Sequence, residues 1–494
     1  MPHNSEFPPP PLHFKGKRTK IYPRWHRTHR SDCASEFLWK ELVPVKKIHE
    51  INMTKGNLLP ELLQFILPLM ASSLLQLAFN AADLIVVGRF GRPNALAAVG
   101  SNGSMINLIV NVLMGLATGG GVLCARHFGA GDKEKLRRTV STALMVGFVG
   151  GIFTGALGVA LAEPMLRLID SPPEVRPLAA VYLRIYFMGM PVIALYNFSS
   201  AGLRAMGDTE RPLFFLAIAG VLNVLLNLFF VLVLHIDVAG VALATVLSQC
   251  VSCFLTVRCL LRTEALGVRD LRFSGTILRQ MLRIGLPAGI QGSMFSISNF
   301  LIQSSINSFG AAVVAGNAAC VSLEGFIYTP QDATAQAATT AISQNVGAQE
   351  FDRAKKAVRF CLALVVGLAS VLIALAFLFR RSLLGLYTTD EAALSAAYIR
   401  LTIVMGCNIF NGTMAVMTGV NRGLGYGMLP AAVTFLGACV FRIVWVYTVF
   451  ASHRTLGWLY ISYPISWIVT TAALFVCYYA VRNRAFKHAL AEKA

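Results

Sequence analysis

The chain has 494 residues, of which 55% are hydrophobic and only 14% are charged, and its mean hydropathy is +0.62. Soluble domains usually carry about 25% charged residues, so this composition excludes the soluble domains that the length alone suggests. The formal net charge of +19 would suggest nucleic acid as the partner of a soluble protein. Here the basic residues lie in the stretches that connect apolar segments. We therefore expect membrane lipids as partners and no nucleic acid.

Residues 1–57 form a basic tail that is unlike the rest of the chain. The first part is rich in proline, and no apolar core of 7–15 residues is present, so the tail is not a secretory signal. We expect disorder here. The stretch that begins at Met53, MTKGNLLPELL, resembles a natural protein start. Residues 1–52 are therefore interpreted as an upstream extension that is dispensable for function.

Apolar stretches of roughly 20 residues recur along the remaining chain, and each could cross a ~30 Å hydrocarbon core as a helix. A membrane barrel would instead show alternating segments of ~10 residues, and none is seen. The sequence therefore predicts an all-α polytopic membrane protein with twelve transmembrane helices. The predicted spans are 60–86, 95–123, 138–162, 178–201, 212–234, 239–261, 279–306, 312–342, 357–379, 394–418, 429–451 and 456–480.

The distribution of Lys and Arg predicts the orientation of these spans. If the N-terminus is cytoplasmic, the short loops and the C-terminal tail on that side carry about three times as many basic residues as the opposite loops. This is the positive-inside pattern, and it predicts a multi-pass protein with both termini in the cytoplasm. We expect the bacterial cytoplasmic (inner) membrane as its location.

An internal repeat divides the spans into two halves of six. An even number of spans in each half means that both halves enter from the same side, as parallel repeats with a cavity between two bundles. The predicted lobes are 58–265 and 279–482, with a cytoplasmic linker at 266–278 and a C-terminal tail at 483–494. The matched positions are Pro68 and Pro287, Asn80 and Asn299, Phe90 and Phe309, Gly91 and Gly310, Gly129 and Gly347, Arg204 and Arg422, Gly207 and Gly425, Pro212 and Pro430, and Gly240 and Gly457.

Four passages resemble the multidrug and toxic compound extrusion (MATE) family: NAADLIVVGRFGRPNALAAVG (80–100), LRAMGDTERP (203–212), VAGVALATVLSQ (238–249) and QNVGAQ (344–349). Residues 296–326 resemble one bacterial branch of it. The resemblance implies two six-helix lobes arranged in a V. It also implies export of organic substrates in exchange for protons or sodium ions. We expect no cofactor beyond that coupling ion, amphipathic and chiefly cationic small molecules as substrates, and a monomer.

The resemblance also implies a cation-coupling site in the first lobe, made of Asp83, Asn223, Asn227 and Thr245. A carboxylate inside a membrane is costly and typically functional, although Asp83 could instead be solvated at the rim marked by Arg89. The family carries a second acid where this chain has Asn227, which favours protons over sodium as the coupling ion. The alternative is that the two asparagines and Thr245 only bond helix backbones.

In the second half, four polar residues are predicted to line the substrate cavity: Glu324, Tyr328, Gln331 and Asp332. The first three share a helix face by their spacing, and Pro330 should bend that helix. The alternative for Glu324 is an ion pair with Arg400 or Arg442. Arg400 and its counterpart Arg184 are predicted to extend their charged heads toward helix ends.

Two further function classes remain as alternatives to the exporter. A flippase for lipid-linked sugars shares the architecture, but usually carries several charges along its cavity. A membrane-embedded enzyme would need clustered His, Cys or paired acids at mid-depth, and the carboxylates here are scattered. The CxxC of Cys250 and Cys253 has no second pair or nearby His, so it is interpreted as packing and not as a metal site.

Overall fold

The structure is a computed structural model that describes residues 51–91, 94–168, 172–263, 272–388 and 390–491. Most of the predicted N-terminal tail and residues 266–271 of the predicted linker lie outside these ranges. The regular structure of the described residues is helical throughout. The described residues all belong to one compact unit.

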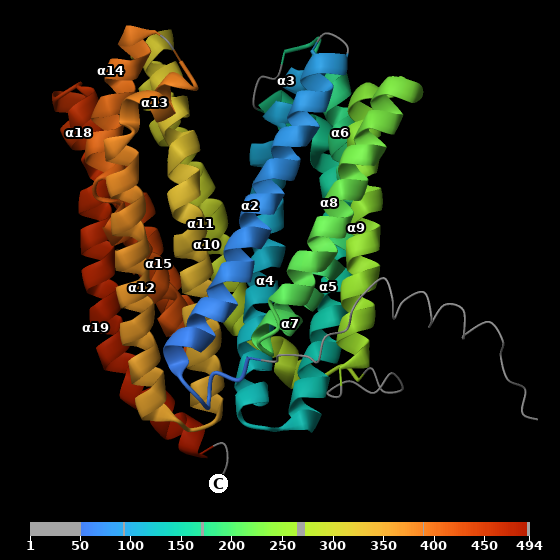
Figure 1. Cartoon of the computed structure of the whole chain (residues 1–494), viewed down its shortest axis with the longest axis vertical. Helices are drawn as coiled ribbons and strands as arrows, with labels where there is room; N and C mark the ends of the chain where they lie inside the picture. Colours follow the sequence, from blue (N-terminus) through green and yellow to red (C-terminus); the bar gives the residue numbers. More distant parts are fainter. Residues whose placement is uncertain (1–50, 92–93, 169–171, 264–271, 389, 492–494) are drawn as a thin grey trace, which may run out of the picture. The chain divides into compact units, whose positions relative to one another are not determined.

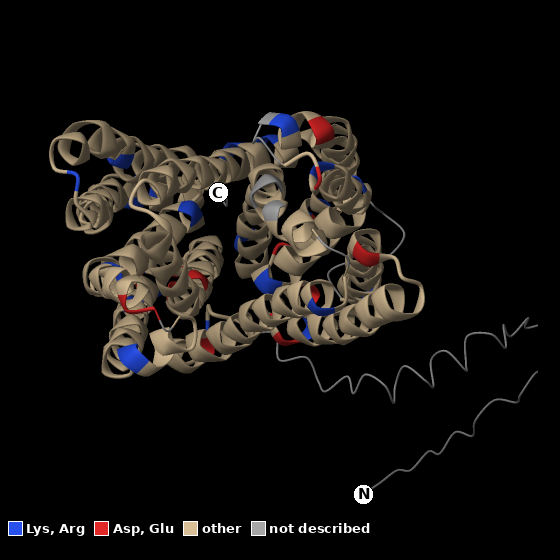
Figure 2. Cartoon of the chain, turned by 90° about the horizontal axis from the view of Figure 1, so that it is seen from above, with Lys and Arg blue, Asp and Glu red and all other residues tan. Residues whose placement is uncertain are grey.

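The first lobe comprises the helices before residue 263. Seen along the helices, they stand beside those of the second lobe (Figure 2). In chain order they are α2 (Leu58–Phe90), α3 (Ala95–Ser101), α4 (Gly103–Gly129), α5 (Lys133–Leu168), α6 (Arg176–Met188), α7 (Met190–Ala205), α8 (Glu210–Leu228), the π-helix η1 (Phe229–Val233) and α9 (Asp237–Arg262).

The second lobe begins with a helix that starts inside the predicted linker and ends with one that runs through most of the predicted tail (Figure 1). Its elements are α10 (Gly275–Asn307), α11 (Ala311–Gly347), α12 (Phe351–Leu378), α13 (Arg380–Gly385), α14 (Glu391–Arg400), η2 (Leu401–Met405), α15 (Asn408–Gly423), α16 (Met428–Thr434), η3 (Phe435–Val440), α17 (Phe441–Trp445), η4 (Val446–Phe450), α18 (Leu456–Tyr460) and α19 (Ser462–Ala491).

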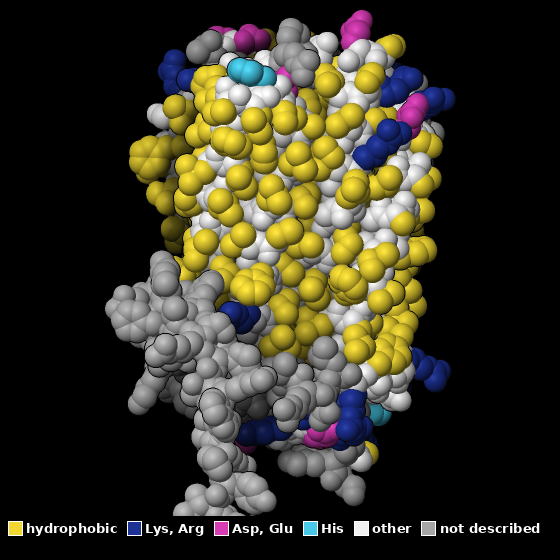
Figure 3. Space-filling model, turned by 90° about the vertical axis from the view of Figure 1, so that its right-hand side faces the viewer, with side chains coloured by type: hydrophobic (Ala, Val, Ile, Leu, Met, Phe, Trp, Pro, Cys, Tyr) yellow, Lys and Arg dark blue, Asp and Glu magenta, His cyan; other side chains and the backbone are white. Residues whose placement is uncertain are grey.

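Within the described residues, nine helices are long and apolar enough to cross a membrane, and two bent helix pairs raise the number to eleven. The predicted span that is not among these is 279–306, which corresponds to α10; this helix has 33 residues but is rich in Ser, Gln and Asn. Hydrophobic side chains cover the middle of the face in Figure 3, with charged side chains gathered toward both ends. The chain is therefore an all-helical polytopic membrane protein.

The two bent spans occupy equivalent places in the two lobes. The helix pair α6–α7 bends by 50° beside Gly189, and the pair α14–α15 bends by 43° beside Gly406. A Cβ atom at Gly189 would lie 2.5 Å from Val246, and one at Gly406 would lie 2.5 Å from the backbone oxygen of Thr402. Glycine therefore permits close contact at both bends, and the internal repeat extends to the bending of its spans.

The repeat is also visible where the lobes meet, at the ends of α4 and α11 that precede residues 130–132 and 348–350. A Cβ atom at Gly129 would lie 2.0 Å from the backbone oxygen of Gln344, and one at Gly347 would lie 1.9 Å from that of Arg126. Each lobe thus places the equivalent glycine against the equivalent backbone position of the other lobe. Gly207 and Gly425, which match in the repeat, both have positive φ, at 91° and 95°.

Between α4 and α10 the lobes approach each other backbone to backbone. Gly115 and Gly119 on α4 face Gly285 and Gly289 on α10, so a GxxxG motif lies on each side. A Cβ atom at Gly115 would lie 2.2 Å from the backbone nitrogen of Gly289. Any larger residue at these positions would hold the lobes apart.

The segment before α2 also bridges the lobes. Met53 is fully buried, and its backbone nitrogen donates to Gln344 Oε1 at 3.1 Å. Arg353 Nε donates to the Met53 carbonyl at 2.7 Å, and its guanidinium also pairs with Glu61 at 2.9 Å. Ile51 is buried and packs against Gly207. Residue 51 is therefore part of the fold, although the hypothesis of a dispensable extension places it outside the functional protein.

Candidate functional site

Three of the four residues predicted for cation coupling lie together in the first lobe. Helix α2 packs closely on α8, because a Cβ atom at Gly220 would lie 1.6 Å from the ring of Phe79. One turn further along α2, Asp83 Oδ1 accepts a short hydrogen bond from Asn227 Nδ2. The same amide nitrogen donates to Asn223 Oδ1 at 3.2 Å. The i, i+4 spacing of the two asparagines puts both on the face of α8 toward Asp83.

The electrostatics of this cluster are unusual for a buried acid. The Asp83 side chain is only 9% exposed, which contradicts the alternative of a residue solvated at the rim. In the part of the chain that the structure describes, Asp83 forms no salt bridge. Asn227 is fully buried, and its Oδ1 atom has no hydrogen-bond partner there. A buried carboxylate without a counter-charge is stable only when it is protonated or holds a cation.

Thr245, the fourth predicted member, makes a different contact. Its hydroxyl donates to the Val241 carbonyl at 3.0 Å within α9, which is the alternative stated for it. Residues 229–233, which begin two positions after Asn227, form the π-helix η1. Single π-turns in helices occur frequently at functional sites, and this one widens the helix next to the cluster.

In the second lobe, Glu324 lies in a buried ion pair, as its alternative interpretation states. Arg400 donates from Nε and Nη2 to the two Glu324 oxygens at 2.9 and 2.8 Å. Arg400 also donates to Asn317 Oδ1 at 2.9 Å, and Tyr460 donates to the same oxygen at 3.2 Å. Arg400 is only 4% exposed, so the prediction that it extends toward a helix end is wrong. Its carboxylate partner holds it inside the lobe.

The other predicted members of that face also belong to the lobe interior. Tyr328 donates to Glu324 Oε2 at 3.3 Å. Gln331 Nε2 donates to Asn408 Oδ1 at 2.8 Å, and Gln331 Oε1 accepts from Asn411 at 3.0 Å, which ties α11 to α15. Arg184, by contrast, is exposed and pairs with Glu163 at 3.4 Å.

Asp332 does lie at a cavity, and that cavity is formed by both lobes. It has a volume of about 290 Å³ and lies between α4 on one side and α10, α11 and α15 on the other. Asp332 accepts a hydrogen bond from Gln336 at 2.8 Å. The lining residues are Asn111, Met114, Gly115, Thr118, Ala288, Gln291, Gly292, Phe295, Asp332 and Arg422.

The sequence interpretation did not include Arg422 and Gln291 among the cavity residues. Arg422 Nη2 donates to Gln291 Oε1 at 2.7 Å. The repeat had already marked Arg422 as the counterpart of Arg204, and this was the available signal. Gln291 carries no such signal, because it is one of several polar residues on α10 and only its contact with Arg422 distinguishes it.

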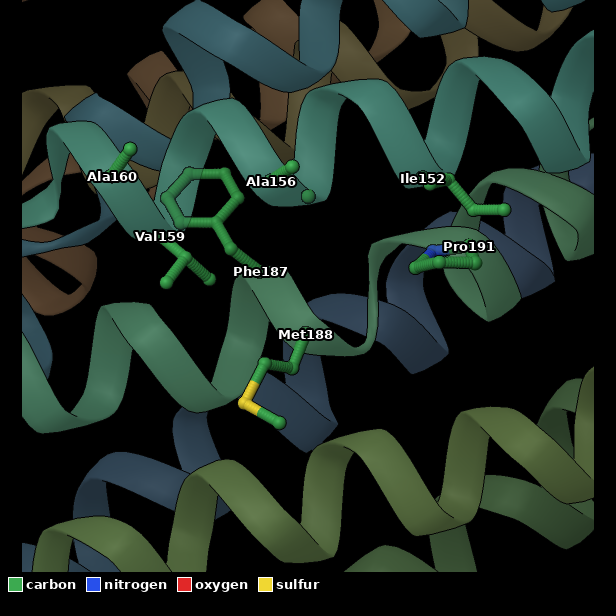
Figure 4. A pocket seen from close by; sticks show the side chains of 8 residues that line it. Ile152, Ala156, Val159, Ala160, Phe187, Met188 and Pro191 are labelled. Atoms are coloured by element: carbon green, nitrogen blue, oxygen red, sulfur yellow. The ribbon is translucent and has the colours of Figure 1, made fainter.

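A second hollow, of about 430 Å³, has a different character. It lies between α5 and the bend of α6 and α7, and its lining is apolar, with Ile152, Val159, Phe187, Met188 and Pro191 among the side chains (Figure 4). No titratable group lines it. Among the described residues no group of three His, Cys, Asp or Glu could hold a metal ion.

The fold and the site together define a class of protein. Two repeated helical lobes enclose a polar cavity, and one lobe holds a buried acid that has no counter-charge among the described residues, as expected of an alternating-access membrane transporter. The MatE family model matches residues 68–229 and again residues 287–448, so the chain belongs to that family. The double match confirms the internal repeat and the family resemblance. It also places the chain among transporters and not among enzymes.

Related proteins carry names of the same kind. The "Probable multidrug resistance protein YoeA" of Bacillus subtilis is 26% identical over 84% of this chain and 92% of its own length. A "FAD transporter" of Shewanella oneidensis is 25% identical over 67% of this chain and 75% of its own length. The crystal structure of a MATE protein in the bent conformation has a TM-score of 0.83 at 22% identity, covering 90% of this chain and all of that one.

Proposed function

We propose that this protein is a secondary active multidrug efflux transporter that exchanges amphipathic organic substrates, chiefly cations, for protons or sodium ions. The observation that carries the proposal is the buried cluster of Asp83, Asn223 and Asn227. Several of its relatives are named as multidrug resistance proteins, which supports amphipathic organic substrates, although one relative is named as a FAD transporter.

Coupling requires one group that exchanges an ion between two states of the transporter. Asp83 is suited to this role, because burial favours its neutral or cation-bound form. When the lobe opens to water, the ionised form becomes stable and the bound ion can leave. Asn227 is in direct contact with the exchanging group, since its amide donates to the same carboxylate.

The composition of the cluster favours protons. Sodium is a hard cation that is best held by several carboxylate and carbonyl oxygens. Here one carboxylate is present, and the other oxygens are those of two neutral amides: the Asn223 oxygen accepts from Asn227 at 3.2 Å, and the Asn227 oxygen has no hydrogen-bond partner among the described residues. Thr245 uses its hydroxyl within its own helix. A proton needs only Asp83.

The test is efflux of a cationic dye from inside-out vesicles, with pH and sodium gradients imposed separately. The wild-type protein should accumulate dye when the pH gradient is imposed. Asp83→Asn should reach the membrane normally and lose uphill transport, while Glu174→Gln, an exposed acid, should behave as wild type. Uphill transport by Asp83→Asn at the wild-type rate would contradict the coupling role.

The same vesicles separate the exporter from its alternative. A flippase for lipid-linked sugars would leave dye unmoved and would instead prevent these lipids from accumulating in a deletion strain.

We further propose that the protein is a monomer of the bacterial inner membrane with both termini in the cytoplasm. Labelling from outside should then reach a cysteine at Gly310 and miss one at Arg279.

A further inference from the structure

The cavity between the lobes contains an arginine that forms no ion pair with a carboxylate in the described part of the chain. Arg422 lies in the last turn of α15, and its guanidinium donates to the neutral side chain of Gln291 at 2.7 Å. Its Nε atom is buried and has no hydrogen-bond partner in the described part of the chain. Arg422 also lines the cavity, and a charged donor in a cavity wall is a site for an acceptor of opposite charge.

The nearest acid in the cavity does not fill this role. Asp332 is within electrostatic range of Arg422, but no ion pair joins them in the described ranges. Gln336 holds Asp332 by a 2.8 Å bond and accepts from Arg204 Nη1 at 3.3 Å. The carboxylate is thus tied to the opposite lobe through Gln336, and Arg422 is left facing the cavity.

We propose that Arg422 recognises a carboxylate or phosphate group on the transported molecule, with Gln291 positioning the guanidinium. This inference rests on the proposed function and widens its substrate class from cations to amphiphiles that carry an acidic group. Asp332, at the same cavity, would attract an ammonium group and repel the acid. Phe295 and Met114 supply the apolar wall that an amphiphile needs.

The test is equilibrium binding of three fluorescent probes to the full chain in lipid nanodiscs. Dansylglycine carries a carboxylate, dansylglycinamide is neutral, and dansylethylenediamine carries an ammonium on the same fluorophore. Wild-type protein should bind dansylglycine at least tenfold more tightly than dansylglycinamide, the ratio expected for one charge-assisted hydrogen-bonded pair.

Arg422→Gln should abolish this preference and leave the affinity for dansylglycinamide unchanged. Arg422→Lys should keep part of the preference, because it retains the charge without the planar fork. Asp332→Asn should strengthen binding of dansylglycine and weaken that of dansylethylenediamine. Arg454→Gln, which changes an exposed arginine, is the matched control and should have no effect.

Two results would overturn the proposal. One is equal affinity of the wild-type protein for dansylglycine and dansylglycinamide. The other is an equal loss of all three probes in Arg422→Gln, since that would make Arg422 a support of the cavity and not a recognition residue. Failure of dye efflux with the dansylglycine preference intact would refute the exporter function alone.

Discussion

The glycine contact between α4 and α10 predicts how the transporter can be held in one state. In Gly115→Ala, the new Cβ atom would lie 2.2 Å from the backbone nitrogen of Gly289 and 2.5 Å from the backbone oxygen of Gly285. Both neighbours are backbone atoms, so the clash can be relieved only if the helices separate by roughly 1 Å. Such overpacking typically costs about 1–3 kcal/mol.

The substitution raises the free energy of the arrangement described here, in which the two glycine motifs touch. It does not raise the free energy of an arrangement in which the lobes have separated along α4. A difference of about 1–3 kcal/mol shifts a two-state equilibrium by roughly 5–150-fold. Gly115→Ala should therefore populate the separated arrangement. Gly367→Ala is the control, since nothing lies within 4 Å of a Cβ atom on that glycine.

The measurement is the distance distribution between spin labels at Lys135 and Asp352, which are exposed near the ends of α4 and α11 where the lobes meet. The native cysteines must be replaced first, because nine free thiols lie within the described residues. Gly115→Ala should move population to longer distances, and Gly367→Ala should not. An unchanged distribution in Gly115→Ala would refute the view that these glycines set the closure of the lobes.

Three further predictions follow from single contacts. Glu324→Gln should destabilise the second lobe by about 3–5 kcal/mol, because it leaves the Arg400 charge buried and unpaired. Thermal unfolding in detergent should show a lower melting temperature, and an unchanged one would contradict this. Arg353→Ala removes contacts to Glu61 and to three backbone carbonyls between Met53 and Gly56, and should make the segment before α2 sensitive to protease, whereas Arg359→Ala should not. Asn227→Asp adds a second acid beside Asp83 and should increase the dependence of dye efflux on sodium; efflux that still ignores sodium would show that the cluster holds protons alone.

The fold could be predicted from the sequence because the membrane imposes simple rules. Apolar stretches must become helices, and repeated Pro, Gly and Arg positions relate the two halves. The boundaries were less accessible. Helix α10 begins at Gly275 and α19 continues to Ala491, both beyond the predicted spans. These ends were missed because polar residues at a helix end carry no hydrophobic signal.

The candidate site was predictable only in part. Asp83, Asn223 and Asn227 were identified because they match the positions that the family resemblance implies for cation coupling, and because a carboxylate is unusual in an apolar span. Glu324 has the same unusual character, but whether it faces a cavity or Arg400 depends on how α11 packs against α14. Packing between distant helices also decides that Gln331 supports the lobe while its neighbour Asp332 reaches the cavity. No local pattern distinguishes these cases.

The reciprocal contact at the ends of α4 and α11 has an evolutionary consequence. Gly129 meets Gln344 and Gly347 meets Arg126, and these are the same two positions of the repeat taken in exchanged order. A contact of this form is isologous, the kind that two identical subunits make across a two-fold axis. The two six-helix halves of this one chain therefore meet here as two identical subunits would. The glycine pairs of α4 and α10 have no glycine counterparts between α11 and α2, where Ala333, Ala337, Ile66 and Met70 stand at the equivalent positions, so the two contacts between the halves differ.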